Sequence, residues 1–261
     1  MIHDLKVFFT LIAFNIKVTL AYRASLVISL ILNILWVVSF IIFIEVIFQN
    51  VVTLGGVSKG ETLLIMAFYY LFTNISDIFY RDSFEQFGEK MRTGYIDMWL
   101  TKPASSRMLM FMSNMRFDYI TAIAVTVALF AYAFRTLNST PDIHLLLFGI
   151  GISLIAHVIF FSVLSMLATL NFWLEKTDTL NMVAWQLTQV GRYPRAIYTS
   201  WARIVFTYVL PLAILANLPA EVALKIATTE SIIVFFAITI TLYIVSFLFW
   251  KKGLTRYSSA G

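Results

Sequence analysis

Six apolar runs, each close to the length of a membrane-spanning helix, constrain this chain more than any other feature of its sequence. A helix needs roughly 20 apolar residues to cross a bilayer, because lipid admits only segments that satisfy their own backbone polar groups. The fourth and sixth runs contain no Asp, Glu, Lys or Arg, whereas Pro211 interrupts the fifth. The sequence therefore predicts an all-α integral membrane protein, one domain over 1–261, with transmembrane helices at 24–48, 62–80, 119–137, 144–170, 201–219 and 231–250.

The composition supports the same fold class. Hydrophobic residues make up 60% of the 261 residues and charged residues 13%, whereas a soluble domain has roughly 45–50% apolar and about 25% charged residues. The net charge of +5 comes from basic residues that border the apolar runs, which is typical of membrane topology. The chain has no cysteine, which excludes disulfides, thiol catalysis and thiolate metal sites. We therefore expect contact with membrane lipid and none with nucleic acid.

The basic residues also predict the orientation of the chain. If the N-terminus lies inside the cell, sixteen of the 19 Lys and Arg fall in cytoplasmic segments, and the outer loops keep only Lys59, Arg135 and Lys225. Such a bias is typical of the positive-inside rule. We therefore expect a multi-pass plasma-membrane protein with both termini in the cytoplasm. The loop at 81–117 carries six of the 19 and predicts a long cytoplasmic segment.

The region from 181 to 219 allows two topologies. Residues 181–191 are moderately apolar but contain two glutamines, so hydropathy alone predicts a loop or short interfacial helix, with 201–219 crossing the membrane. In the alternative, 181–191 crosses, and 201–219 enters from outside and returns, broken at Pro211. Such re-entrant backbone must be buried in protein or line a cavity. The charge count favours the first topology, because the second moves three arginines outside: Arg192, Arg195 and Arg203.

Residues 1–22 predict a helix that lies in the membrane interface. Charged residues interleave with apolar ones, so the segment lacks the uninterrupted apolar core of a cleavable signal peptide. Apolar residues recur at helical spacing, which is typical of an interfacial helix; an ordinary soluble amphipathic helix is the alternative. The residues of this stripe are Leu5, Phe8, Phe9, Ile12 and Ile16.

The sequence carries no sign of enzyme chemistry of its own. The glycine-rich stretch at 55–60 lacks the spacing and the hydroxyl of a phosphate-binding loop. The histidines His3, His144 and His157 are too scattered for a metal site of known spacing. We therefore expect no catalytic residue, metal or cofactor in this chain, and any energy from ATP would come from a partner.

The centre of the basic loop predicts a short amphipathic helix. Gly94 permits a turn before it, and Pro103 disfavours helix in the residues just ahead of the proline. Ile96, Trp99 and Leu100 occupy positions i, i+3 and i+4 and form one apolar stripe. Such a stripe packs either on the membrane or the chain's own spans, or in a groove of a soluble motor protein.

Four motifs resemble permease subunits of the type-2, export-type family of ATP-binding-cassette (ABC) transporters. The run G-Y-I-D-x-x-L-x-K-P at 94–103 resembles the first cytoplasmic loop of these permeases. The other three are similar to a bacterial subgroup: G-R-Y-P-x-x-I-Y at 191–198, V-L-P at 209–211, and F-W-K-K-G-L-x-R-Y-S-S-A-G at 249–261. The four motifs follow one another in order along the chain.

The resemblance implies six spans per subunit, an interfacial N-terminal helix, and two membrane subunits assembled with two ATPase subunits that hold ATP and Mg. The second membrane subunit could be an identical copy or a related chain. It also implies export across a bacterial inner membrane and favours the re-entrant form of 201–219. The helix at 94–103 would then be a coupling helix on the ATPase, through Arg92, Gly94, Asp97, Trp99, Leu100, Lys102 and Pro103, with Glu175 as a second contact.

Four polar residues inside the predicted spans are candidates for a translocation path. Charged groups in a bilayer are costly and usually face the bundle interior or a water-filled path. Glu45, near the outer end of the first span, would suit cationic or amphipathic cargo, although solvation at the membrane boundary is the simpler interpretation. Asn33 and Asn74 could instead join helices, and His157 could bond to a neighbouring helix.

A second class of function is also compatible with the sequence. The basic loop could bind anionic lipid in a membrane scaffold or assembly factor that transports nothing. Copurification with an ATP-hydrolysing subunit separates the two hypotheses, because only the permease requires that partner.

Overall fold

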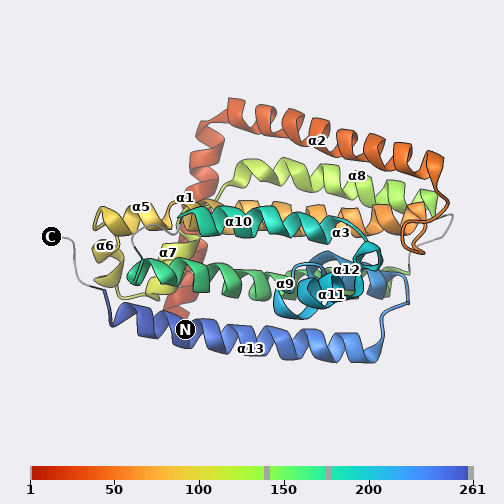
Figure 1. The fold of residues 1–261 in the computed structure, drawn as a ribbon. Coiled ribbons are helices and arrows are strands. Elements are labelled where there is room, and N and C mark those ends of the chain that lie inside the picture. The colour runs from red at the N-terminus through yellow and green to blue at the C-terminus, as the bar shows by residue number, and fades with distance from the viewer. Residues whose placement is uncertain (1, 138–141, 175–177, 258–261) are drawn as a thin grey trace.

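The structure is a computed structural model that describes residues 2–137, 142–174 and 178–257, and within these ranges it contains helices and no strand beyond an isolated bridge. Five helices are long and apolar enough to cross a membrane, and they form one bundle (Figure 1). The predicted class, an all-α integral membrane protein, is confirmed. The five helices are α2 (Arg23–Asn50), α3 (Lys59–Phe79), α8 (Ile120–Thr136), α9 (Ile143–Thr169) and α13 (Thr229–Leu254).

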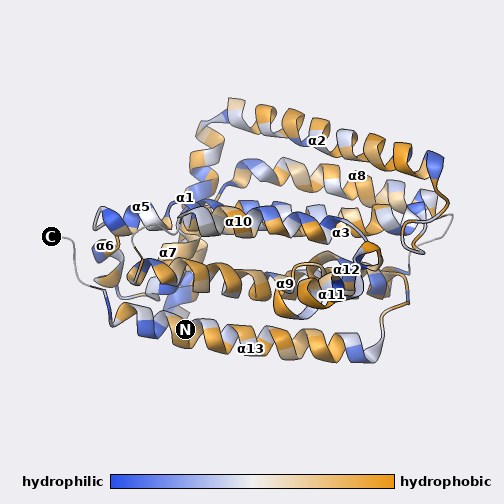
Figure 2. Cartoon of the chain, viewed as in Figure 1, coloured by the Kyte–Doolittle hydropathy of each residue, from blue (hydrophilic) through white to orange (hydrophobic). Residues whose placement is uncertain are grey.

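The five helices differ in how much of their surface the rest of the protein covers. In the most apolar window of α2 only 11% of the residues are buried, and in that of α13 only 17%, whereas the value for α3 is 78%. Hydrophobic residues run along α2 and α13 (Figure 2), so both helices suit an environment of lipid. The centre of the bundle is therefore α3, which packs against α8 and α9.

The short helices between α3 and α8 gather at one end of the bundle, which we call the α6 end (Figure 1). The segment 81–117, expected to be a loop, is largely helical, because its apolar residues pack on the protein's own core. We refer to its four α-helices together as the α4–α7 unit. They are α4 (Arg81–Glu85), α5 (Phe87–Arg92), α6 (Asp97–Leu100) and α7 (Ser106–Met112).

The N-terminal helix α1 (Ile2–Ala21) rests on the α4–α7 unit. The Ser105 N–H donates to Asp4 Oδ1 at 2.9 Å, and Asn15 Nδ2 donates to the Ser113 carbonyl at 3.2 Å. Val7 and Leu11 pack against the core, whereas other apolar side chains of α1 are exposed, as an interfacial helix requires. Its most exposed large apolar residues are Leu5, Phe9, Phe14 and Leu20.

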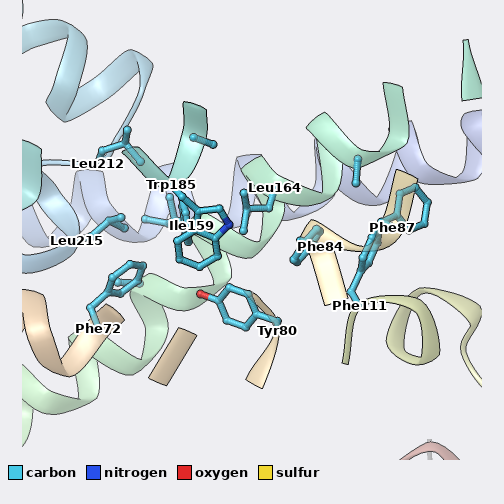
Figure 3. Close-up of a cluster of buried hydrophobic side chains, with 14 of the residues drawn as sticks. Phe72, Tyr80, Phe84, Phe87, Phe111, Ile159, Leu164, Trp185, Leu212 and Leu215 are labelled. Carbon is cyan, nitrogen blue, oxygen red and sulfur yellow. The ribbon is translucent and has the colours of Figure 1, made fainter. Parts of the chain in front are cut away.

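An aromatic cluster joins the α4–α7 unit to the spans (Figure 3). Phe84 of α4 stacks on Phe111 of α7 with ring centroids 4.3 Å apart, and Trp250 of α13 lies 5.2 Å from Phe111. Trp185 meets Phe160 of α9 edge-on at 4.8 Å. The α4–α7 unit and these spans therefore share one densely packed core.

The segment after α9 runs from the α6 end to the opposite end of the bundle, which we call the α12 end. It consists of α10 (Asp178–Thr188), a 3-10 turn (Gln189–Arg192) and a stretch with little regular structure. The ring of Trp185 lies 6.2 Å from that of Tyr80, just beyond α3, whereas Ala196 lies against Gly55 in the α2–α3 connection. Of the structures that hydropathy allows at 181–191, a short helix is found, because α10 covers most of this range. Several of its polar side chains line a cavity instead of facing lipid, and hydropathy cannot detect that difference.

The predicted fifth span at 201–219 is a hairpin, not a straight helix. Its first limb is α11 (Ser200–Ile204) with a π-helical turn (Val205–Val209), its second limb is α12 (Ile214–Ala223), and the two are bent by 94°. Both flanks lie at the α12 end: Arg195 pairs with Glu221 at 2.8 Å, and Lys225 pairs with Asp142, just before α9, at 3.2 Å. The chain therefore enters and leaves at the same end, as in the re-entrant alternative.

Candidate functional site

The predicted coupling helix exists, but its apolar stripe is divided between two environments. Gly94 makes the turn before α6 with a φ of 70°, a conformation that glycine adopts at little cost. The Ile96 side chain is fully buried and Trp99 is only 4% exposed, whereas Leu100 is 38% exposed. Pro103 follows the helix on the surface. The stripe therefore packs largely on the protein itself and leaves one side of α6 free.

The free side of α6 carries a small apolar patch, which we call the α6 patch and define as Tyr95, Met98 and Leu100. These side chains are 47%, 41% and 38% exposed. Two exposed basic residues, Arg92 and Lys102, border the patch. Exposed apolar groups with a charged rim are typical of a protein interface.

The other predicted docking residues contact their own chain. The Lys90 Nζ lies 5.2 Å above the ring of Trp99, and Tyr95 meets the same ring edge-on at 5.2 Å. Asp97 lies near the C-terminal segment, where burial and the Asp97 carboxylate raise the pKa of Tyr257 to about 12. These contacts lie on the side of α6 that faces the protein. The residues of the α6 patch stay exposed on the other side.

A buried arginine ties α7 to two spans. The Arg107 side chain is 8% exposed; its Nε donates to Ser165 of α9 at 3.1 Å, and its Nη2 donates to Ser246 of α13 at 2.8 Å. The guanidinium also lies 5.2 Å above the ring of Phe161. Burial lowers the pKa of Arg107 from its ordinary value, and these contacts with two helices make it the polar anchor of the α4–α7 unit.

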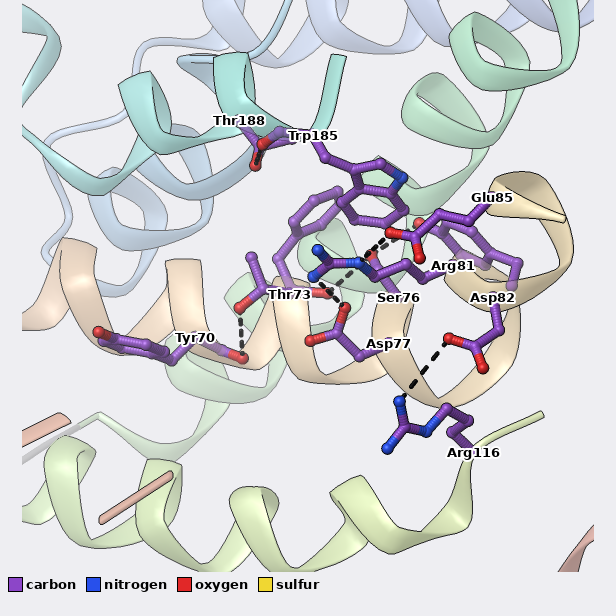
Figure 4. A network of polar contacts seen from close by, with 12 residues as sticks. Tyr70, Thr73, Ser76, Asp77, Arg81, Asp82, Glu85, Arg116, Trp185 and Thr188 are labelled. Carbon is purple, nitrogen blue, oxygen red and sulfur yellow. Dashed lines mark hydrogen bonds and ion pairs between the residues drawn. The ribbon is translucent and has the colours of Figure 1, made fainter. Parts of the chain in front are cut away.

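A second polar network connects the end of α3 to the start of α8 (Figure 4). Arg81 donates to Asp77 at 3.0 Å and to Glu85 at 2.8 Å, and it lies 4.8 Å above the ring of Trp185. Nearby, Arg116 pairs with Asp118 at 2.7 Å and reaches Asp82 at 3.9 Å. Each arginine thus already has carboxylate partners.

A cavity of about 900 Å³ opens between α2, α3 and the chain around α10. It extends from Arg81 and Arg116, near the α6 end, to Arg192 in the 3-10 turn. Two of the four predicted path residues, Asn33 and Asn74, line it. Asn74 also donates to Thr126 of α8 at 2.9 Å, whereas Asn33 bonds within its own helix.

The other two predicted path residues lie outside this cavity. Glu45 pairs with Lys59 and accepts a hydrogen bond from Tyr132 at 2.6 Å, so its charge is neutralised near the α12 end. His157 is bonded through Nδ1 to the Tyr80 hydroxyl at 2.9 Å and stacks on Phe72 of α3. Neither side chain is a lining residue of the cavity.

The structure adds a residue that the sequence did not identify as part of a site. Arg192 is 4% exposed, and its guanidinium lies 3.7 Å above the ring of Phe40 and 4.8 Å above that of Tyr69. The signal was available in the sequence, since Arg192 is the first charged residue after a stretch of thirteen uncharged ones. In the structure the Arg192 guanidinium lies beside Tyr69, in the middle of α3.

Two expectations fall on residues that the structure does not describe. Glu175, the second predicted ATPase contact, lies outside the described residues, as do the last four residues of the C-terminal motif, 258–261. Among the described residues, no group of three or more His, Asp or Glu side chains could hold a metal ion.

Comparison with known families gives one match. A family model described as an ABC-2 family transporter protein matches residues 33–261, which include the α4–α7 unit, most of the cavity lining and the bent segment at 200–223. Comparisons with curated proteins and with solved structures gave no match.

Proposed function

Because this chain belongs to the ABC-2 family of transporter proteins, we propose that it is the permease subunit of an exporter driven by a separate ATPase. In this proposal the ATPase holds ATP and Mg, and the permease supplies the membrane path. The complex contains two ATPase subunits and two permease subunits, the second permease being a copy of this chain or a related one. Its location is the bacterial inner membrane, with the α6 end and both termini in the cytoplasm.

The observation that carries this proposal is the α6 patch on a unit that is packed firmly against the spans. An exposed apolar patch with a basic rim suits a groove on a soluble partner. Behind the patch, the stacked pair Phe84–Phe111 and the anchor Arg107 connect the unit to α9 and α13. A force on the patch is therefore transmitted to helices that cross the membrane.

The same connection supports a mechanism. ATP binding would draw the two ATPase subunits together and shift the α4–α7 unit of each permease. Packed helices respond by moving between discrete arrangements and not by continuous deformation, so the shift would change which side of the membrane the cavity faces. The partner drives this change only because it binds one arrangement more tightly than the other.

The proposal is tested by placing a charge in the α6 patch. Leu100→Asp should weaken the contact by about 2 kcal/mol or more, because a carboxylate would be desolvated in an apolar groove. Val52→Asp is the matched control, since Val52 is 90% exposed in the α2–α3 connection at the other end of the bundle. Copurification of the ATPase and its rate of ATP hydrolysis are measured for both variants in membranes.

Loss of ATPase binding in Leu100→Asp, with normal binding in Val52→Asp, is the expected result. Equal ATPase binding and equal transport by both variants would refute the docking role. If no ATPase copurifies and the α4–α7 unit instead binds anionic vesicles in a salt-sensitive manner, the membrane scaffold is the correct interpretation.

A further inference from the structure

We propose that Arg192 and Tyr70 form an anion-binding site at the deep end of the cavity, and that the cargo is an amphiphile with a negatively charged oxyanion head group. This inference rests on the proposed transport function and specifies its substrate class. It differs from the expectation that Glu45 selects cationic cargo.

The position of Arg192 is unusual for a charged group. Its Nη2 lies 3.4 Å from the hydroxyl of Tyr69, which is the middle residue of α3 (Lys59–Phe79). Because α3 crosses the bundle from the α12 end to the α6 end, this places the guanidinium near the middle of the span. A charged side chain at that depth is costly and is typical of a functional site.

Two other arginines of the cavity lining, Arg81 and Arg116, have acidic partners, and Arg23 is exposed at the surface, whereas the buried Arg192 has no acidic partner among the described residues. Arg81 and Arg116 are ion-paired with the carboxylates described above. Within the described part of the chain, no ion pair includes Arg192, and its Nε has no hydrogen-bond partner. The acidic residue of the cavity lining, Asp77, lies two helical turns from Tyr70, about 11 Å along α3. The deep end of the cavity therefore carries an uncompensated positive charge.

A second polar atom at this place also lacks a partner. The hydroxyl of Tyr70, a residue that is 5% exposed, has no hydrogen-bond partner in the described structure, and Tyr70 lines the same cavity as Arg192. The Tyr70 ring lies 5.7 Å from the guanidinium of Arg192. Buried donors without partners are rare in proteins. A third, Trp185 Nε1, belongs to the part of the lining near Arg81, whereas those of Arg192 and Tyr70 lie together and point to a ligand that accepts hydrogen bonds from both.

The chemistry of the two donors selects the ligand class. A guanidinium binds a carboxylate or phosphate through two parallel hydrogen bonds, and a phenol adds a third donor. A cation would be repelled, and the rings of Phe40 and Tyr69 already occupy the face of the guanidinium. Only an oxyanion satisfies both the charge and the free donors.

The walls of the cavity extend this argument to the rest of the ligand. On the α2 side the lining includes Ile28, Leu32 and Trp36, which are more than half exposed. The volume of about 900 Å³ is within the range for sites that enclose a drug-sized molecule. A ligand with an apolar body along α2 and an anionic head at Arg192 therefore matches both parts of the lining.

The test measures binding to the full chain in phosphatidylcholine nanodiscs, without the ATPase. The probes are dodecyl phosphate and dodecyltrimethylammonium, each tagged with bromine on the alkyl chain so that bound probe quenches tryptophan fluorescence. Trp36 and Trp185 line the cavity and report on it. Because both probes partition into the bilayer, quenching by the cation measures the non-specific component, and saturable quenching by the anion alone is expected.

Four variants give the expected pattern. Arg192→Gln should weaken binding of dodecyl phosphate roughly 10- to 100-fold, because it removes a charge-assisted hydrogen bond, and Arg192→Lys should restore part of the affinity. Tyr70→Phe should weaken binding roughly threefold or more without lowering the melting temperature, since the hydroxyl it removes has no partner in the empty protein. Arg203→Gln, an exposed arginine outside the cavity, is the control and should bind like the unaltered chain.

Equal binding of the anionic and cationic probes, or unchanged affinity in Arg192→Gln, would overturn the proposal. If Arg192→Gln does not fold, Tyr70→Phe is the deciding variant, and an unchanged affinity for dodecyl phosphate would overturn the proposal. Absence of anion binding because a carboxylate of a second copy pairs with Arg192 would also overturn it.

A competition arm identifies the source of the anion. Displacement of dodecyl phosphate by inorganic phosphate means that a free oxyanion suffices, whereas failure of inorganic phosphate to compete means that the ligand must enter from the membrane. Both results support the anion site. Because the assay needs no ATPase, its failure leaves the transport proposal untouched if Leu100→Asp still uncouples the complex.

Discussion

Asn217 shows how one side chain can determine the course of the chain around it. Its Nδ2 donates to the carbonyl of Ala213 at 2.9 Å and to that of Tyr193 at 3.1 Å, and its Oδ1 accepts the N–H of Arg195 at 2.8 Å. The residue is 1% exposed. Asn217 therefore provides hydrogen-bond partners for the Tyr193 carbonyl and the Arg195 N–H, which lie outside the α-helices. Buried backbone groups without such partners are costly.

We expect Asn217→Ala to lower the free energy of unfolding by about 1–3 kcal/mol, because it leaves buried backbone groups unpaired. Asn50→Ala is the control: Asn50 is exposed at the end of α2 and makes one local bond, to the carbonyl of Val46. Its effect should stay within about 0.5 kcal/mol. Thermal unfolding in detergent, followed by tryptophan fluorescence, measures both, and equal losses would contradict the assignment.

Single residues also show where reasoning from the sequence reaches its limit. Glu45 stands out as an acidic group in a span, yet Lys59 neutralises it from the far side of the α2–α3 connection. In the sequence Arg192 stands out only in a motif and in the count of basic residues, yet it lines the cavity beside Tyr69 and Tyr70. Partners that meet only after folding decide which charge is satisfied, and a one-dimensional pattern does not contain them.

Helices α9 and α12 approach each other most closely at a glycine. A Cβ atom on Gly149 would lie 2.7 Å from the carbonyl oxygen of Pro219 and 3.1 Å from the ring of Phe68. A carbonyl on a packed helix cannot rotate away like a side-chain end. The close packing of α12 on α9 therefore depends on the absence of a side chain at this position of α9.

Gly149→Ala should push α12 away from α9 and destabilise the protein by about 1–3 kcal/mol, as overpacking does elsewhere. Gly151→Ala lies on the same helix with no other atom within 4 Å of the added carbon, so it should be neutral or stabilise by up to about 1 kcal/mol through helix propensity. Melting temperatures of the two variants test this difference. The same loss in both would show that the close contact is not what Gly149 provides.

Arg107 belongs to the scale of elements, because it determines whether α7 moves with α9 and α13. Arg107→Met keeps much of the apolar stem but removes the bonds to Ser165 and Ser246. We expect amide exchange in α7 to become roughly tenfold faster, equivalent to about 1.4 kcal/mol, and ATPase coupling to fall. Lys252→Met, an exposed position near the end of α13, is the control for loss of a positive charge. Unaltered amide exchange in α7 would show that Arg107 does not tie α7 to α9 and α13.

Helices with a long apolar run were predictable, whereas the segment at 181–192, whose polar side chains line a cavity, was not. Five spans could be located from hydropathy because lipid requires an apolar surface, and α2 and α13 have it along their length. Hydropathy did not identify α10 and the 3-10 turn after it as part of the bundle, because Gln186, Gln189 and Arg192 line a cavity. The apolar stripe of α6 was predicted, but not which of its residues are buried. Trp99 is buried because it belongs to one core cluster with Phe84 and Phe87, and that cluster forms only when the chain folds.

The distribution of charge over the whole molecule is consistent with the re-entrant topology. The re-entrant topology places three arginines in the outer half of the molecule, which reduces the excess of basic residues on the cytoplasmic side. These arginines, however, are not free charges in a loop. Arg192 is buried, Arg195 pairs with Glu221, and Arg203 donates to the carbonyls of Ala196 and Tyr198. The positive-inside rule counts Lys and Arg in short loops, so these buried or bonded arginines weigh little against the re-entrant topology.

Labelling of single cysteines tests the orientation of the whole chain, and the absence of native cysteine makes the background clean. Thr101→Cys beside α6 should react with a membrane-impermeant maleimide only after cells are permeabilised, whereas Val52→Cys, at a position 90% exposed, should react in intact cells. Ile197→Cys separates the two topologies. Because residue 197 lies at the α12 end with Gly55, it should react from outside in the re-entrant topology. Protection of Ile197→Cys in intact cells, with normal reaction at Val52→Cys, would restore the straight fifth span.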